Sequence, residues 1–155
     1  YLTQFLFNSS KFSKKKNRRN KIHLIQPHLG IIESCLKQIP TLSWTGKDIS
    51  FLINSLQVVR DNDTGVIKLL VLLTSIIAAS LNRKNTLTTQ GISMIMYGLQ
   101  GMSSDSSELC ALLGMIALNI IHINENFTSQ AVGNVLYGMK RMSSDSAEVR
   151  AMLLA

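Results

Sequence analysis

Residues 87–113 read LTTQGISMIMYGLQGMSSDSSELCALL, and residues 127–153 read FTSQAVGNVLYGMKRMSSDSAEVRAML. The two stretches agree at a spacing of 40 residues, and the agreement includes a Tyr-Gly pair and a complete Met-Ser-Ser-Asp-Ser segment. Agreement of this length does not arise by chance between unrelated segments. The chain therefore contains an internal repeat of about 40 residues, a period that is typical of stacked helix pairs.

A weaker copy of the same pattern lies upstream in residues 44–70, which read WTGKDISFLINSLQVVRDNDTGVIKLL. It matches the second copy at a spacing of 43 residues, so we expect three extra residues in the connection around Ser80 to Asn85. Residues Leu29 to Ile39 are suited to the second helix of a still earlier unit. The expected organisation is a helical array over residues 25–155, with units near 44–86, 87–126 and 127–155, the last of them truncated.

Each unit has the chemistry of a helix, a tight turn and a second helix. Thr88 and Thr128 precede the first helix and are suited to cap its free amides. Asp105 and Asp145 precede the second helix, and each has a Glu three positions later, which is a capping-box pattern. Both helices carry apolar residues at helical spacing, and two such stripes per unit are buried only when units stack. We therefore predict an all-α fold, a right-handed α-solenoid of helix-turn-helix repeats of about 40 residues.

Gly98 and Gly138 fall in the middle of first helices, each directly after a Tyr. Glycine at such a position costs about 1 kcal/mol relative to alanine. Its recurrence predicts that the backbones of neighbouring helices approach closely at these two residues. The Tyr-Gly pair is thus most simply a packing feature.

The formal net charge of +7 is unevenly distributed along the chain. No acidic residue precedes Glu33, whereas seven basic residues lie between Lys11 and Lys21. Basic and acidic residues balance from residue 22 onward. We expect residues 1–24 to form a basic, flexible arm that either contacts nucleic-acid phosphates or serves as a solvated linker or a remnant of a targeting segment.

The most apolar stretch runs from Leu69 to Leu81. As a helix it rises about 20 Å, which is short of the roughly 30 Å hydrocarbon core of a bilayer. We therefore expect a buried helix and no membrane contact. Cys35 and Cys110 stand apart from each other and from any histidine, so we predict reduced core residues in an intracellular, reducing compartment.

Motifs of catalysis are absent from the sequence. It contains no phosphate-binding GxxxxGK[ST] loop, no GxSxG segment and no HExxH segment, and His23, His28 and His122 do not form a cluster. We therefore expect a binding module that is not an enzyme and that has no cofactor, metal site or catalytic residues.

The segment TTQGISMIMYGLQGMSSDSSELCALL and its second copy resemble the degenerate helical repeats of the octotricopeptide and heptatricopeptide families of algal and protist organellar proteins. They are also similar to the repeats of RNA-editing accessory subunits. The resemblance covers residues 44–155, although the proline-rich PPPE-like element of the octotricopeptide pattern is absent. It implies an RNA-binding helical-repeat module in a mitochondrion or plastid, which acts in RNA processing, stability, editing or translation. The implied partners are single-stranded RNA and other proteins of an RNA-processing complex.

Polar and aromatic residues line the face of each first helix that lies opposite its apolar stripe. In repeat proteins that bind one base per unit, base preference is determined by side chains that differ between otherwise similar units. The predicted RNA-binding residues are Asn134 and its counterpart Met94 for base contact, Tyr97 and Tyr137 for stacking, and Lys140, Arg141 and Arg150 for phosphate contact. The simpler interpretation of all seven is that they are solvated helix residues.

A second functional class fits the same pattern. Scaffolds of the HEAT or armadillo kind also stack helix pairs of similar length, and they bind proteins instead of RNA. The balanced charge after residue 22 favours this alternative, because RNA-binding surfaces usually carry excess positive charge. The sequence also predicts that the apolar face of the final unit is uncovered and promotes self-association.

Overall fold

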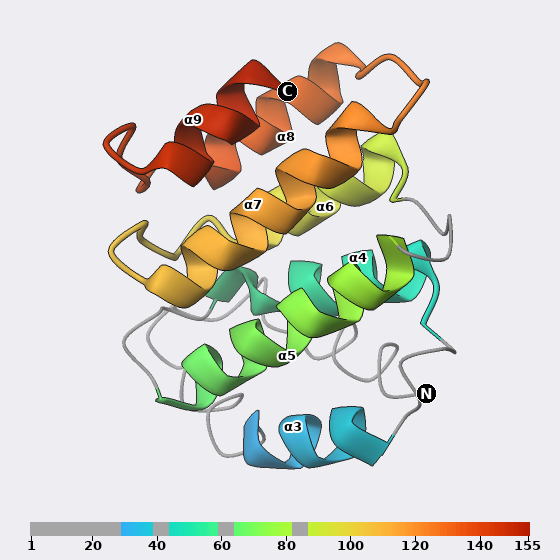
Figure 1. Cartoon of the computed structure of the whole chain (residues 1–155), viewed down its shortest axis with the longest axis vertical. Helices are drawn as coiled ribbons and strands as arrows, with labels where there is room; N and C mark the ends of the chain where they lie inside the picture. Colours follow the sequence, from blue (N-terminus) through green and yellow to red (C-terminus); the bar gives the residue numbers. More distant parts are fainter. Residues whose placement is uncertain (1–28, 39–43, 59–63, 82–86) are drawn as a thin grey trace, which may run out of the picture.

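The computed structural model describes residues 29–38, 44–58, 64–81 and 87–155 (Figure 1). These residues form α-helices and one short 3-10 helix and contain no strand, which confirms the all-α prediction. The predicted arm at residues 1–24 lies outside the described residues. The helices are α3 (Leu29–Gln38), α4 (Gly46–Asn54), η4 (Ser55–Val58), α5 (Thr64–Leu81), α6 (Thr89–Gly98), α7 (Ser107–Ile121), α8 (Ser129–Gly138) and α9 (Ala147–Leu154).

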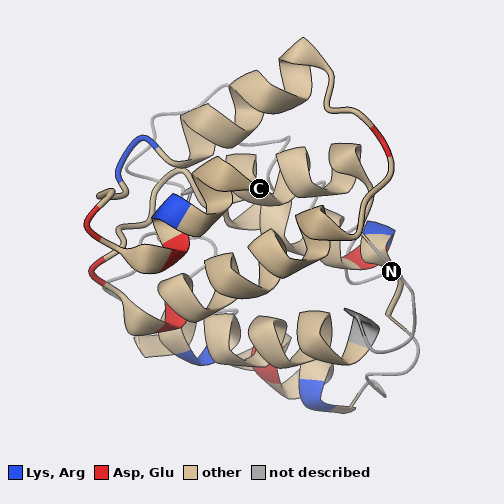
Figure 2. Cartoon of the chain, turned by 45° about the horizontal axis from the view of Figure 1, so that its top comes forward, with Lys and Arg blue, Asp and Glu red and all other residues tan. Residues whose placement is uncertain are grey.

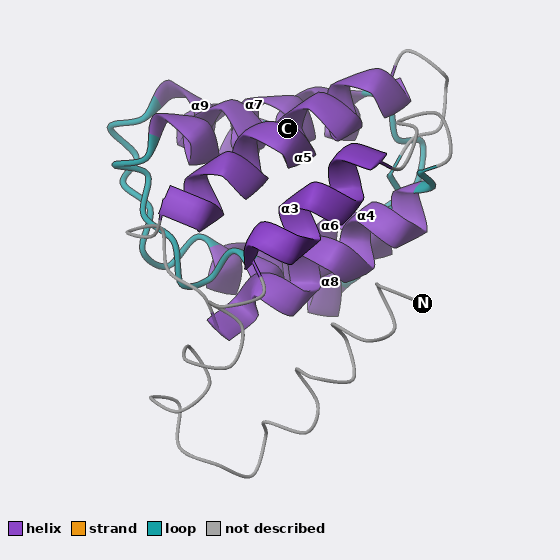
Figure 3. Ribbon diagram, turned by 90° about the horizontal axis from the view of Figure 1, so that it is seen from below, coloured by secondary structure: helices purple, strands orange, loops and turns teal. Residues whose placement is uncertain are grey.

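The helices lie in two layers, with alternate helices of the chain in each layer (Figure 3). One layer contains α4, α6 and α8 side by side, and the other contains α3, α5, α7 and α9. The helix pairs of the chain are α4–α5, α6–α7 and α8–α9. Each helix packs mainly against the helix of its own layer that belongs to the next pair along the chain. Within each layer, neighbouring helices therefore come from successive pairs of the chain.

Threonine caps start the first helix of each pair in the same way. The hydroxyl of Thr88 accepts a hydrogen bond from the Gly91 amide at 3.0 Å, and that of Thr128 accepts one from the Ala131 amide at 3.1 Å, as predicted. Thr45 does the same at the start of α4, where Asp48 completes a capping box. Each cap binds one of the amides that a helix start leaves without a partner. The first helices therefore begin at equivalent positions.

The caps of the second helices differ from the prediction. The N-cap residues are Ser106 and Ser146, whereas Asp105 and Asp145 lie one position earlier, in the turn. The Asp105 carboxylate accepts a hydrogen bond from the Ser103 hydroxyl at 2.6 Å, and Asp145 is held equivalently by Ser143. The capping-box assignment to the two aspartates was thus wrong, because local bonds inside the turn take up their carboxylates.

The apolar stripes form one continuous core between the layers. Ile92, Ile95, Met96, Leu99 and Met102 of the α6 segment are fully buried, and so are Leu109, Leu112, Leu113 and Ile116 of α7. Helix α5 contributes the same pattern, with residues such as Leu69, Leu73 and Ile77 fully buried. None of the described helices combines the length and hydropathy that crossing a bilayer requires.

The three extra residues of the first pair lie mainly in a helix. Helix α5 has 18 residues and α7 has 15, and both begin at equivalent positions. The extra residues therefore extend the last turn of α5 to Leu81. The predicted range, Ser80 to Asn85, thus begins within α5, and residues 82–86 lie outside the described residues.

Two glycines allow the first helices to approach closely. A Cβ atom on Gly98 would collide with the backbone carbonyl of Ile53 in α4, and one on Gly138 would collide with the carbonyl of Met96 in α6. Ile53 and Met96 are themselves equivalent residues at the 43-residue spacing. The predicted close contact is thus confirmed, and it recurs at both interfaces. The expected position in the middle of the helices is wrong, because Gly98 and Gly138 are the last residues of α6 and α8.

These contacts predict the effect of adding one methyl group. Gly98→Ala and Gly138→Ala should each lower the free energy of unfolding by about 1–3 kcal/mol, because the helices must separate. Gly133→Ala is the matched control in α8, since nothing lies within 4 Å of its added Cβ. It should raise stability by up to about 1 kcal/mol through helix propensity. Chemical denaturation measures all three, and equal effects at Gly133 and Gly138 would contradict the close approach.

A buried amide in α7 supplies a second prediction. Asn119 is fully buried, and its Nδ2 donates to the Met115 carbonyl at 3.0 Å, but its Oδ1 has no hydrogen-bond partner among the described residues. The equivalent residue of α5 is Ile76, which is also buried. Asn119→Leu should therefore raise the free energy of unfolding by about 1 kcal/mol. Asn119→Ala, which removes the amide but leaves a cavity, should gain less, and a lower stability for the Leu variant would count against the orphaned oxygen.

Candidate nucleic-acid interface

The predicted polar face exists as a row of side chains across α4, α6 and α8. Equivalent positions of the three helices are occupied by Lys47, Gln90 and Gln130. The positions one turn later are occupied by Phe51, Met94 and Asn134. The row is in register because the three helices begin with equivalent threonine caps. Gln90 and Met94 border the hollows on both sides of α6, so the row is continuous.

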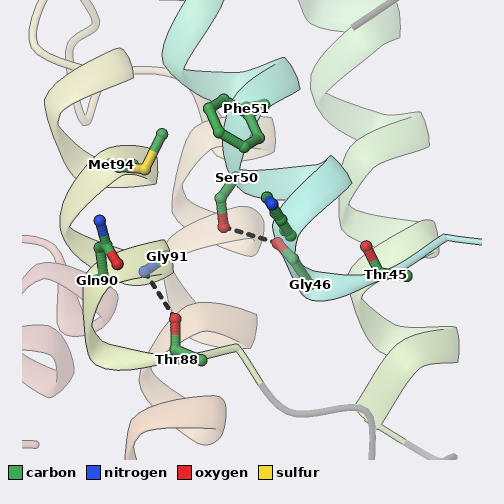
Figure 4. A pocket seen from close by; sticks show the side chains of 9 residues that line it. Thr45, Gly46, Ser50, Phe51, Thr88, Gln90, Gly91 and Met94 are labelled. Carbon is green, nitrogen blue, oxygen red and sulfur yellow. Dashed lines mark hydrogen bonds between the residues drawn. The ribbon is translucent and has the colours of Figure 1, made fainter.

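The first hollow lies between α4 and α6 and has a volume of about 470 Å³. Gln90 and Met94 of α6 stand opposite Ser50 and Phe51 of α4 across this hollow (Figure 4). The Ser50 hydroxyl donates to the Gly46 carbonyl at 2.7 Å, which fixes it along the helix. The hollow thus combines apolar surface from Met94 and Phe51 with a carboxamide group.

The second hollow lies between α6 and α8 and has a volume of about 600 Å³. Gln90, Ser93 and Met94 line it from α6, and Gln130 and Asn134 line it from α8. Met94 and Asn134, the predicted base-contact pair, therefore belong to one site, and both are partly buried. Carboxamides offer a donor and an acceptor side by side, as the edge of a planar base requires.

Glu125 closes one side of the second hollow. It lies in the connection between α7 and α8, and its carboxylate accepts a hydrogen bond from the Thr89 hydroxyl at 3.4 Å. A carboxylate repels phosphate groups but accepts hydrogen bonds from amino groups. This hollow is therefore better suited to an uncharged ring with amino groups than to a phosphate.

The two predicted stacking residues stack on each other. The ring centroids of Tyr97 and Tyr137 are 5.6 Å apart, and the ring planes differ by 22°. Each ring thus covers part of one face of the other, since the 40-residue spacing places them on adjacent helices. A base cannot enter between them unless the tyrosines separate, so the predicted stacking role is restricted to the outer surface of this ring pair.

Lys140 is engaged by its own neighbours. Its Nζ lies 3.8 Å from the centroid of the Tyr137 ring and donates to Oε1 of Gln100 at 3.3 Å. A cation over a tyrosine ring is stabilised by about 0.5–1 kcal/mol at an exposed site. Contact between Lys140 and a phosphate would therefore compete with these two interactions.

The predicted arginines lie at the edge where the turns gather. Arg141 is exposed in the turn after α8, and Arg150 is exposed on α9 in the other layer. Nη1 of Arg150 donates to the Ser144 and Asp145 carbonyls at 2.6 and 2.9 Å, which brings the side chain back over its own turn. The structure thus places the three cations along one edge, away from the hollows that contain Met94 and Asn134.

Opposite charges share this edge (Figure 2). The described residues contain six lysines and arginines and seven acidic residues, so the excess positive charge of the chain belongs to other residues. The basic residues are Lys37, Lys47, Lys68, Lys140, Arg141 and Arg150, and the acidic residues are Glu33, Asp48, Asp105, Glu108, Glu125, Asp145 and Glu148. The described surface therefore lacks the basic field that steers nucleic acids to many of their binding proteins.

No three His, Cys, Asp or Glu side chains in the described part of the chain gather closely enough to hold a metal ion. His122 stands at the C-cap of α7, where it is exposed. Cys110 is a free thiol, and its Sγ donates to the Ser104 carbonyl at 3.3 Å. It is half-buried in the first turn of α7, so the predicted core location of Cys110 is only partly correct.

Comparisons with models of protein families, with curated proteins and with solved structures found no match to this chain. The fold and the two hollows are therefore the basis for any assignment of function.

Sequence reasoning did not find every residue of the row. Ser50 and Ser93 line the hollows one turn after Lys47 and Gln90 of the row, and helical spacing alone could have found them. Glu125 and Gln100 could not be found in this way, because their roles depend on contacts between adjacent pairs.

The second-helix caps generate a prediction about pH. The amide of Glu108 and the Ser106 hydroxyl lower the pKa of Glu108, and the Ser146 hydroxyl, followed by the amide of Glu148, lowers the pKa of Glu148. The hydroxyl contacts measure 3.0 and 2.7 Å. A lowered folded-state pKa gives stability that is complete above the ordinary value of 4.5 and is lost as the pH falls through the folded-state pKa.

The melting temperature should thus fall as the pH decreases below about 4.5, and it should fall less steeply in a Glu108→Gln/Glu148→Gln variant. Glu125→Gln, which removes one carboxylate from the connection between α7 and α8, is the control for each single variant, Glu108→Gln and Glu148→Gln. Thermal scans across this pH range measure the difference. Parallel curves for the double variant and the unmodified protein would show that the caps do not contribute.

Proposed function

We propose that the stacked helix pairs are a segment of a right-handed α-solenoid whose α4–α6–α8 face binds single-stranded RNA. The observation that carries the proposal is the continuous pair of hollows in which Gln90 and Met94 serve both sides. Each hollow lies between the first helices of adjacent pairs, so the sites repeat at the spacing of the pairs. A polymer with regularly spaced planar groups matches such a surface.

The side chains of the hollows have distinct roles in this proposal. Gln90, Gln130 and Asn134 bind the edges of bases through their carboxamides, whereas Met94 and Phe51 contact the base faces. Asn134 stands where the preceding helix has Met94, so the two sites differ in base preference. Splayed single strands present both edges and faces, whereas an RNA duplex hides them, which favours single-stranded RNA.

Phosphate contacts come from the turn edge and the basic arm. Arg141 is exposed there, and Lys140 and Arg150 reach phosphates when they give up their present contacts. The seven basic residues between Lys11 and Lys21 supply further positive charge. Specificity and affinity are thus divided, with the hollows reading bases and the basic residues holding the backbone.

The resemblance to octotricopeptide-like and heptatricopeptide-like repeats supports a role in organellar RNA processing, stability, editing or translation. In this proposal the protein acts in a mitochondrion or plastid, with other proteins of an RNA-processing complex as partners. It is not an enzyme itself, and it needs no cofactor.

A protein-binding scaffold of the HEAT or armadillo kind is the second candidate. The balance of six basic and seven acidic described residues favours it, because the row has little electrostatic attraction for RNA. An extended peptide could also place side chains in the two hollows. The two candidates differ in how binding depends on salt and on the ligand.

Equilibrium binding of the full chain to labelled single-stranded RNA, across a salt series, tests the proposal. Gln90→Ala and Asn134→Ala should each weaken binding about 5-fold, as expected for one lost hydrogen bond. Lys47→Ala should weaken it as well, whereas Lys68→Ala removes the same charge from the opposite layer and should not. All these variants keep the basic arm, so their differences report on the row alone.

Three results would overturn the proposal. No binding at low salt would favour the protein scaffold. Binding that depends only on the arm, with no difference between Lys47→Ala and Lys68→Ala, would remove the row from the RNA site. Preference for duplex RNA would exclude base contacts in the hollows.

A further inference from the structure

The last helix pair has an exposed apolar face, whereas the equivalent faces of the preceding pairs are buried. Val132 and Leu136 of α8 are 44% and 54% exposed, and Leu153 of α9 is 54% exposed. The equivalent residues of the preceding pair, Ile92, Met96 and Leu113, are fully buried. The same holds one pair earlier for Ile49, Ile53 and Leu70. These positions are thus the ones that each pair uses to contact the next pair.

A backbone carbonyl of each first helix is the point at which the next first helix approaches most closely. Gly98 lies directly against the carbonyl of Ile53, and Gly138 lies directly against the carbonyl of Met96. The next carbonyl in this series belongs to Leu136. A helix that covers α8 in the same manner therefore needs a residue without a Cβ atom above Leu136.

Polar contacts at the turn edge also repeat between pairs. The Ser104 hydroxyl accepts a hydrogen bond from the Ser143 amide at 2.8 Å, and the Tyr97 ring stacks on Tyr137. The corresponding groups at the end of the stack are the hydroxyl of Ser144, which is exposed, and the ring of Tyr137. The apolar face thus has polar and aromatic contact points at the same relative positions as the two interfaces inside the protein.

We propose that the face of α8 and α9 binds a further helix pair of the same design. Its first helix places a glycine over the Leu136 carbonyl and an aromatic ring against Tyr137, and its turn donates a backbone amide to Ser144. This inference rests on packing and is independent of RNA binding.

A second copy of the chain in head-to-tail contact does not fit this description. The first helix that a second molecule would offer in head-to-tail contact is α4, which has Ser55 at the position of Gly98 and Gly138. The Cβ of Ser55 would meet the Leu136 carbonyl, just as a Cβ on Gly138 would meet Met96. The required partner is therefore a helix pair with glycine at this position.

An extended chain tests the proposal directly. A second copy of residues 116–155 is added after Ala155, which is in register because Ala155 follows Met115 by 40 residues. The added segment places its own Gly138 over Leu136. Hydrogen exchange of the α8 amides should slow by about 10-fold or more, and the melting temperature should rise, because the last described pair gains a neighbour.

The matched control is the same extended chain with Gly138→Val in the added segment only. It has the same length and nearly the same composition, but it cannot make the close approach. The proposal is overturned if α8 exchanges equally fast in the original and extended chains, or if the Val variant protects α8 equally well. It is also overturned if the original chain forms dimers that Leu136→Glu abolishes while the extension leaves α8 unprotected. No RNA is present in these experiments, so their outcome is separate from that of RNA binding.

Discussion

The close approach of the first helices at Gly98 and Gly138 is the constraint on which the other features depend. Each glycine brings a helix backbone against a carbonyl of the preceding first helix. At this separation the rings of Tyr97 and Tyr137 stack, and Lys140 reaches Gln100. The hollows between Phe51, Met94 and Asn134 have their present width for the same reason. Both glycines end their helices, where glycine costs less than in a helix interior, and a larger residue there would force the helices apart.

Much of the helical architecture could be predicted from the sequence, because its causes are local. The apolar spacing in α6 and α7 indicates buried stripes, and Thr88 and Thr128 indicate where helices begin. The second-helix caps could not be placed to the residue, since Asp105 and Ser106 are both suitable and a bond to Ser103 decides between them. The length of α5 was also ambiguous, because a helix and a connection can absorb the same three residues.

The candidate site was predictable in its position but not in its contacts. Helical periodicity was sufficient to place Met94 and Asn134 on one face. It could not show that the rings of Tyr97 and Tyr137 stack on each other, or that the Arg150 side chain donates a hydrogen bond to the Ser144 carbonyl. These contacts arise between groups from different pairs or within a turn, and their geometry depends on the packing distance. The same limit explains why the basic edge and the hollows turned out to be separate.

The layered arrangement has a consequence for how the molecule gains and loses structure. The main contacts of each helix extend only to the neighbouring pair, so residues that touch are separated by about one repeat along the chain. Ordering of one pair therefore closes only short loops, and growth from any folded pair is entropically inexpensive. Unfolding can likewise start at an end and proceed inward, one pair at a time. Thermal unfolding should therefore be gradual, with a broad melting curve, because helix pairs at the ends unfold before those in the middle.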